Sequence, residues 1–386
     1  MKKVLLGALA AVAMVACSKD DVVEVNRVND QISYGVVANG ATRAADVYCN
    51  NNLPGSFTVS AEHDGKLYFA NDVITVSETG VCSGSDTRYW PNSGDVTFYA
   101  NVNGTMTYTA GSAPQFVDFT VNSTVGSQVD LMYAVQKQGK SAGQVALNFR
   151  HALSQIVFQA KNSSAGKLYV EVSGVEVHNV ASKSTFTFPV KPTTNKVGEH
   201  NGGATNIVYI DGTWGSWATG SADYTTSFTA VPVTSDTAVS LTNTNVTDKE
   251  YSKDAMLLLP QGPTTAWVPS TTTPAAPETD GSYLLINCCI YNQAGASFNA
   301  ATDVALWGAT GAANHKKLAI PASFTWEQGK KYVYTLVFGE GTGGYNPDPE
   351  GTNPEDVLVP ISYSITVDDF VLVTPGTEIE VDKDKE

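Results

Sequence analysis

The stretch LYVEVSGVEVHNV, residues 168–180, indicates the fold class more clearly than any other part of the chain. Val170 and Val172 alternate with other residues before Gly174, and a valine alternation resumes at Val175. Successive side chains of a β-strand point to opposite faces, so this period predicts one long strand with a buried face. Because Gly174 shifts the phase of the alternation, we expect a bulge or a bend there.

The same alternation recurs in short runs that are separated by Gly, Asn, Pro, Ser and Asp, the residues that favour turns. No stretch has the period of a long amphipathic helix. Many short strands with frequent turns predict an all-β protein built from β-sandwiches. Further strands are expected at residues 96–100, 116–121, 145–149, 155–160, 185–188, 206–210, 226–231, 256–259, 283–291, 318–320, 332–338 and 359–367.

A polar stretch at residues 190–203, rich in Thr, Asn, Lys and Gly, predicts a boundary between two domains. The chain of 386 residues is long enough for two domains of ordinary size. We therefore expect one β-sandwich domain at residues 44–189 and a second at residues 190–386.

The N-terminus has the pattern of an export signal. Basic residues precede an apolar run, residues 4–16, which is too short to cross a bilayer as a helix. Cys17 follows this run directly, which is similar to a bacterial lipoprotein leader, in which residues 1–16 are removed and Cys17 is lipidated, here with palmitate among its acyl chains. The alternative is an ordinary signal peptide followed by an incidental cysteine.

The composition excludes some classes of partner. Hydrophobic residues make up 42% of the chain and charged residues 16%, so it can bury folded cores. The formal net charge is −15, whereas binding to nucleic acid or to an anionic membrane needs clustered Lys and Arg. We expect no nucleic acid partner, and membrane contact only through the lipid of the precursor.

The spacing of the other four cysteines does not indicate a metal centre. Cys49 and Cys82 could form a disulfide in an oxidising compartment. Cys288 and Cys289 are adjacent in a strand-like run, so they should point to opposite faces as small buried residues. The sequence has no C-x-x-C spacing, and no histidine clusters along it with these cysteines. We therefore expect no metal and no cofactor.

No catalytic motif is present, and we expect no enzymatic activity. The loop at residues 346–351 places oxygen ligands at alternate positions, as in a calcium loop. It has two prolines and lacks the final glutamate of such a loop, which favours a solvated acidic loop instead.

Several motifs, taken in their order along the chain, resemble the fimbrillins of the Bacteroidetes, the subunits of type V pili. The leader is one of them. The others are Thr42–Ala44, Arg88–Pro91, Asp130–Ala134, Leu147–Ser154, Val175–Val180, Thr185–Phe188, Met256–Gln261, Trp326–Tyr334 and Ile365–Phe370.

The resemblance implies two transthyretin-like β-sandwich domains in tandem and a maturation route. The lipidated precursor reaches the outer membrane and the cell surface, where an Arg-specific protease cuts it. The cut falls between Arg43 and Ala44 and removes a propeptide, residues 17–43, with the first strand. A strand from a neighbouring subunit then fills the opened groove by donor-strand exchange, and a fimbrium grows.

The residues themselves agree with this route. Ile32, Tyr34 and Val36 alternate, so one face of the displaced strand could complete a sandwich core. The chain has only four Arg, and Arg43 lies among small residues that leave it accessible to a protease. Arg88 is flanked by Tyr and Trp, as expected of a folded region.

The donor strand is expected near the C-terminus. Ile379 and Val381 alternate with glutamates, as a strand with one buried face requires. Alternatively, the preceding apolar piece pairs within its own domain and the tail frays. The candidate donor residues are Phe370, Val371, Leu372, Val373, Ile379 and Val381.

The sequence therefore predicts a structural pilus subunit that assembles with other pilin subunits and supports adhesion. The alternative is a tip or accessory adhesin that binds a ligand on a host or bacterial surface. An apolar tail beyond Phe370 favours the first, because a tip subunit can lack a usable donor.

Overall fold

Strands dominate the part of the chain that the structure describes. The computed structural model describes residues 30–38, 54–77, 79–109, 111–190, 193–194, 207–208, 212–217, 222–242, 255–269, 281–347, 355–357 and 359–369. Its helices there are short 3-10 turns: η2 Val125–Ser127, η3 Lys140–Ala142 and η5 Ala312–Asn314. None of the described helices has the length and apolar character needed to cross a membrane. The expected all-β fold is confirmed.

Seven strands between residues 34 and 151 form one sheet, here called the N-terminal sheet. Its strands follow the order β1-β8-β7-β5-β2-β3-β4, so that β1 and β4 are its edges. The pairing is antiparallel except between β1 and β8, which are parallel. The strands are β1 Tyr34–Ala38, β2 Ser56–His63, β3 Lys66–Val76, β4 Cys82–Gly84, β5 Val96–Val102, β7 Met132–Gln138 and β8 Val145–His151.

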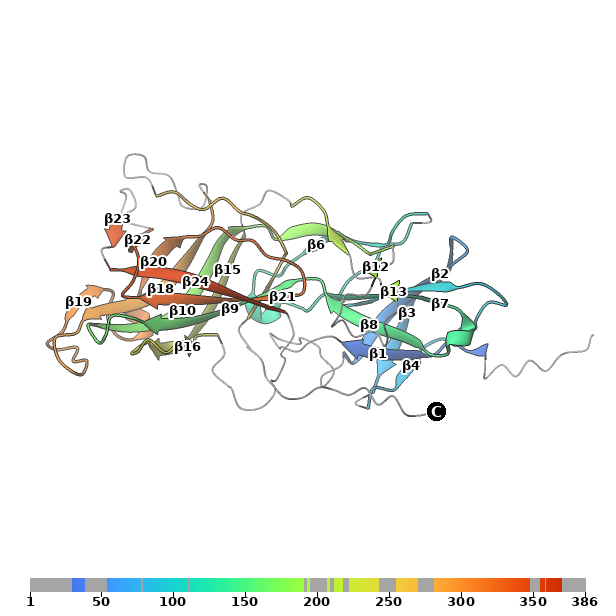
Figure 1. The fold of residues 1–386 in the computed structure, drawn as a ribbon, viewed down its shortest axis with the longest axis horizontal. Coiled ribbons are helices and arrows are strands. Elements are labelled where there is room, and N and C mark those ends of the chain that lie inside the picture. The colour runs from blue at the N-terminus through green and yellow to red at the C-terminus, as the bar shows by residue number, and fades with distance from the viewer. Residues whose placement is uncertain are drawn as a thin grey trace, which may run out of the picture.

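Two further sheets form a sandwich at the other end of the molecule (Figure 1). The β10 sheet has the order β15-β10-β18-β20-β22-β23, and β19 also pairs with β18. Its strands are β10 Leu168–Val180, β15 Ala222–Pro232, β18 Tyr283–Asn292, β19 Val304–Trp307, β20 Lys316–Pro321, β22 Gly344–Asn346 and β23 Glu355–Val357. The β9 sheet has the order β16-β9-β21-β24, and β17 also pairs with β9. Its strands are β9 Ser154–Asn162, β16 Val239–Ser240, β17 Met256–Leu258, β21 Lys330–Phe338 and β24 Ile361–Asp369.

Two small sheets complete the described fold. One has the order β14-β11-β6, with β6 Gln115–Thr120, β11 Lys183–Thr187 and β14 Thr213–Trp214. The other pairs β12 Thr193–Thr194 with β13 Ile207–Val208. Phe186 of β11 packs against Tyr133 of β7, with ring centroids 4.7 Å apart. The β11 sheet therefore connects the N-terminal sheet with the sandwich core.

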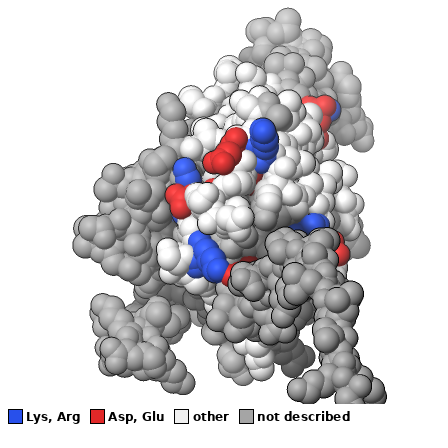
Figure 2. Space-filling view, turned by 90° about the vertical axis from the view of Figure 1, so that its right-hand side faces the viewer, with Lys and Arg blue, Asp and Glu red and all other residues white. Residues whose placement is uncertain are grey.

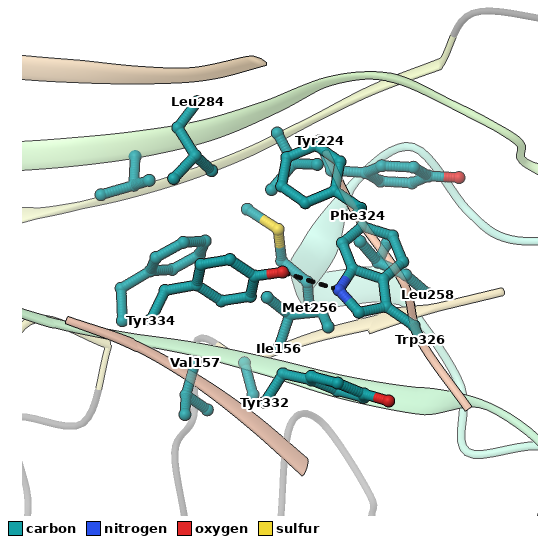
Figure 3. Close-up of a cluster of buried hydrophobic side chains, with 14 of the residues drawn as sticks. Ile156, Val157, Tyr224, Met256, Leu258, Leu284, Phe324, Trp326, Tyr332 and Tyr334 are labelled. Atoms are coloured by element: carbon teal, nitrogen blue, oxygen red, sulfur yellow. Dashed lines mark hydrogen bonds between the residues drawn. The ribbon is translucent and has the colours of Figure 1, made fainter. Parts of the chain in front are cut away.

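The main core lies between the β10 and β9 sheets. Figure 3 shows Leu284 and Tyr224 of the β10 sheet facing Ile156 and Tyr334 of the β9 sheet. The indole Nε1 of Trp326 donates a hydrogen bond of 3.0 Å to the Tyr334 hydroxyl (Figure 3). Burying each such large apolar side chain contributes roughly 1.5–3 kcal/mol, so this core dominates the stability of the sandwich.

The strand of the opening sequence, β10, has the bounds that the alternation predicts. Val170, Val172 and Val175 are all fully buried, so the buried face changes phase between Val172 and Val175. The register with β18 shifts between Val172 and Gly174, which is a β-bulge. The bulge expected at Gly174 is confirmed.

Strand pairing crosses the position predicted as the domain boundary. β9 and β10 precede residue 190, yet they pair with β21, β15 and β18 from the second half of the chain. The boundary between residues 189 and 190 stays a prediction, but this pairing favours a change of sheet between β8 and β9 instead.

Candidate functional site

The segment around β1 is the candidate site, because the sequence singles out its alternating residues. β1 lies parallel to β8, in a register that runs from Tyr34 opposite Val145 to Ala38 opposite Phe149. The Val145 amide donates a hydrogen bond of 2.8 Å to the carbonyl of Ser33. β8 thus provides the hydrogen-bonding edge for this segment.

The residues just before β1 are held from their other side by the segment that follows β4. The Ile32 amide donates to the Arg88 carbonyl, and the Trp90 amide donates to the Asp30 carbonyl, both at 2.8 Å. Gln31 and Tyr89 form an antiparallel bridge. Figure 1 shows β1 beside β4, the opposite edge of the same sheet. The β1 segment therefore closes the N-terminal sheet between its two edges.

One face of the segment completes the core of the N-terminal sheet. Tyr34 is 7% exposed, and its ring packs edge-on against Phe57 and Phe98 at centroid distances of 6.1 and 6.0 Å. Ile32 and Val36 are partly buried and pack against the same cluster. The structure thus places all three predicted residues on the face that meets the core.

The Tyr34 hydroxyl lies in a buried and electrostatically unfavourable place. Within the described residues it has no hydrogen-bond partner. Burial raises the pKa of Tyr34 strongly, and the charge of Asp72 raises it further, whereas Arg88 acts in the opposite direction. The phenol of Tyr34 therefore stays neutral, and its ring packs in the core as an apolar group.

An ion pair between a partly exposed arginine and a buried aspartate fixes the segment that holds the N-terminal residues. Arg88 binds Asp72 with two hydrogen bonds, Nε to Oδ2 at 2.6 Å and Nη2 to Oδ1 at 2.8 Å. Asp72 is 4% exposed, and the Arg88 guanidinium lies 5.1 Å from the centre of the Phe69 ring. A bidentate pair fixes the planar guanidinium, so it also positions the Arg88 carbonyl that accepts from Ile32.

Several predicted residues lie outside the described residues. They are Cys17, Arg43, Ala44, Cys49 and the donor candidates Phe370, Val371, Leu372, Val373, Ile379 and Val381. Cys82 is described and is partly buried. Because its proposed partner Cys49 is not described, the disulfide stays a prediction.

The surface at the N-terminal end is mixed in charge. Figure 2 shows positive and negative side chains interspersed among uncharged ones on the described part of this face. Phosphate binding needs a cluster of cations, and the visible described surface does not provide one.

The fold brings to Cys289 two residues that the sequence does not associate with it. The sequence places no histidine near Cys289, but the fold brings His315 and Glu171 to it, with their ligand atoms within 4.8 Å of one another. The three residues are far apart along the chain, so no local spacing could have identified this cluster. Cys288 and Cys289 are both fully buried, as expected.

The structure is that of an all-β protein in which β1, the first of the described strands, completes the core of the N-terminal sheet. Residues 42–352 match the model of the family described as fimbrillin-like. This match covers most of the chain, and the protein belongs to the fimbrillin-like family. No curated protein matches the chain.

Solved structures of a fimbrial protein and of proteins assigned to cell adhesion are similar to the chain at low identity. A fimbrial protein from Bacteroides vulgatus is 15% identical, with a TM-score of 0.48, over 87% of this chain and 99% of that one. A protein from Bacteroides uniformis that is assigned to cell adhesion is 14% identical, with a TM-score of 0.41, over 88% of this chain and 98% of that one.

Proposed function

We propose that the protein is a pilus subunit that polymerises by donor-strand exchange and supports adhesion. Membership of the fimbrillin-like family supports the class of surface fimbrial subunits. The observation that carries the exchange mechanism is β1. It is a five-residue edge strand whose Tyr34 fills the core, and the chain continues from it toward Arg43.

In this proposal the precursor is a lipoprotein that Cys17 tethers to the outer membrane until it is cut after Arg43. The two arginines that the structure describes are poor protease sites. Arg88 is held by its ion pair with Asp72, and Arg150 lies within β8 opposite Tyr133 of β7. Proteases need an extended and accessible backbone, so these folded contacts disfavour cuts at Arg88 and Arg150, and of the two remaining arginines we propose Arg43, which lies among small residues.

Removal of β1 would expose two features that a donor strand can satisfy. The edge of β8 would lose its hydrogen-bonding neighbour along five residue pairs. The core would lose the Tyr34 ring that lies between Phe57 and Phe98. An exposed edge and an apolar groove together favour strand addition by another chain. Ile379 and Val381 could supply the alternating apolar side chains.

The first test is the substitution Arg43→Ala. We expect this precursor to stay full length during Arg-specific proteolysis and to form no fibres in electron micrographs, because β1 stays in place. Arg27→Ala is the matched control and should be cut and polymerise like the unsubstituted chain. N-terminal sequencing of surface material should give Ala44, and another start would contradict the proposed site.

The second test is a chain that ends at Val373. We expect it to fold and to be cut after Arg43, but not to assemble, because it lacks Ile379 and Val381. Thermal unfolding checks the fold, and electron microscopy checks assembly. Normal fibres from this truncation would exclude the tail as the donor.

The alternative function is that of a tip or accessory adhesin for a host or bacterial ligand. The same experiments distinguish it from a shaft subunit. Limited Arg-specific proteolysis of purified chain should give fibres if the protein forms the shaft. Stable monomers after complete cleavage would favour the tip or accessory role.

A further inference from the structure

A mixed cluster of three potential metal ligands lies in the β10 sheet, far from β1. Glu171 of β10 is directly paired with Cys289 of β18, and His315 comes just before β20. His315 Nε2 is 3.4 Å from Glu171 Oε2, and Cys289 Sγ is 3.9 Å from the same oxygen. The ligand atoms of all three lie within 4.8 Å of one another.

A second layer of hydrogen bonds orients this cluster. His315 Nδ1 is 2.7 Å from Ser173 Oγ, and Asn287 Nδ2 donates to that hydroxyl at 2.9 Å. Ser173 belongs to the bulge of β10 at Gly174, and bulges often redirect a side chain in this way. With Nδ1 engaged, the imidazole presents Nε2 to Glu171. Such a partner on the second ring nitrogen is typical of a metal-bound histidine.

The carboxylate of Glu171 is also held in place. The Tyr169 hydroxyl donates to Oε1, which leaves Oε2 facing the other two ligands. The Gly311 amide donates to Oε2 at 3.3 Å. The His315 side chain is fully buried and that of Glu171 is 15% exposed, so the cluster lies just beneath the surface.

We propose that Glu171, Cys289 and His315 bind one Zn²⁺ ion. Tetrahedral zinc with ordinary bond lengths places its N, O and S ligands roughly 3.3–3.6 Å apart. The two distances to Glu171 Oε2 require only small movements to reach that geometry. A thiolate with an imidazole favours zinc over calcium and magnesium, which prefer oxygen ligands. Water would occupy the fourth position, on the exposed side of Glu171.

The ion would connect β10, β18 and the segment between η5 and β20. These elements supply the ligands from positions 171, 289 and 315, of which the first lies more than a hundred residues before the other two. Because a metal that binds only the folded state stabilises it, zinc should raise the thermal stability of the chain.

The test uses the purified, tag-free full chain, kept reduced with a non-chelating phosphine, and titrated with Zn²⁺ or Co²⁺. We expect one Zn²⁺ per chain, and a Co²⁺ spectrum with a thiolate charge-transfer band and the visible bands of a tetrahedral site. Cys289→Ala should abolish the charge-transfer band. Cys288→Ala is the matched control, because its thiol faces the main core and should leave the band unchanged.

His315→Gln removes a proposed ligand, so it should weaken zinc binding by at least about a hundredfold, the upper value for losing an outer-shell partner. His63→Gln, in β2 of the N-terminal sheet, should not weaken it. The spectrum of the unsubstituted chain tests the site even if the Cys289 variant does not fold. The proposal is overturned if the unsubstituted chain gives no tetrahedral Co²⁺ spectrum, or if folded Cys289→Ala keeps the thiolate band.

Discussion

At the scale of single residues, Tyr34 makes two opposite contributions to stability. Its ring is buried against Phe57 and Phe98, which stabilises the closed N-terminal sheet. Its hydroxyl is buried without a hydrogen-bond partner among the described residues, which costs about 1–3 kcal/mol. The role of the side chain therefore depends on the ring and not on the hydroxyl.

Two substitutions at Tyr34 separate these contributions. We expect Tyr34→Phe to leave the free energy of unfolding of the precursor unchanged or to raise it, because it removes the unsatisfied hydroxyl. Tyr34→Ala should lower it by about 3–5 kcal/mol, the usual cost of a large cavity. Urea unfolding of the uncut precursor measures both. A Phe variant as unstable as the Ala variant would show that the hydroxyl makes a contact that stabilises the fold.

At the scale of elements, alternation predicted strands well where it continues on both sides of a single bulge, as in β10. β10 has the predicted bounds, whereas the alternation predicted no strand at the positions of β2 and β3. The β2–β3 pair contains two register shifts, and Asn71 in β3 has a positive φ of 55°, so the period is interrupted.

Pairing partners were harder to predict than strands, because alternation tells which face is buried but not which strand lies alongside. The sequence identified Ile32, Tyr34 and Val36, but not their parallel neighbour β8 or the Arg88 segment. In the same way, it placed Cys289 in a strand but could not bring it to His315. Both arrangements depend on contacts between distant parts of the chain.

The bulge in β10 gives a prediction at this scale. A Cβ atom at Gly174 would lie 3.2 Å from the carbonyl oxygen of Thr226, closer than ordinary packing allows. We expect Gly174→Ala to lower the free energy of unfolding by about 1–2 kcal/mol. Gly126→Ala, which meets no atom within 4 Å, is the control and should change it by less than about 0.5 kcal/mol. Equal effects would mean that close packing at the bulge is not the cause.

At the scale of the whole molecule, one charged cluster spans four strands of the β10 sheet. His178 of β10 lies 2.9 Å from Glu176 Oε2 and 3.1 Å from Asp223 Oδ1 of β15. Its ring stacks on Tyr283 of β18, and Lys317 of β20 binds Glu176 at 3.0 Å. Protonation of His178 therefore affects contacts across the sheet.

Burial lowers the pKa of His178, but the ion pairs with Asp223 and Glu176 outweigh it and raise the pKa to about 9. The folded chain thus binds this proton more tightly than the unfolded chain, in which a histidine titrates near about 6.5. The stabilisation is complete below that value and is lost as the pH rises through about 9. Burial opposes ionisation of Glu176 and Asp223, but His178 lowers both of their pKa values, so their contribution is lost toward acid.

We therefore expect stability to be greatest between about pH 5 and 6.5 and to fall on the alkaline side as His178 loses its proton. After allowance for the partly exposed Asp223, the loss between pH 6 and 9.5 should be about 1–2 kcal/mol. His178→Gln should remove this part of the pH dependence in urea unfolding, because glutamine carries no proton to lose. His63→Gln, in β2 of the N-terminal sheet and outside this cluster, serves as the control. The assignment fails if the His178 variant loses as much stability between the two pH values as the unsubstituted chain.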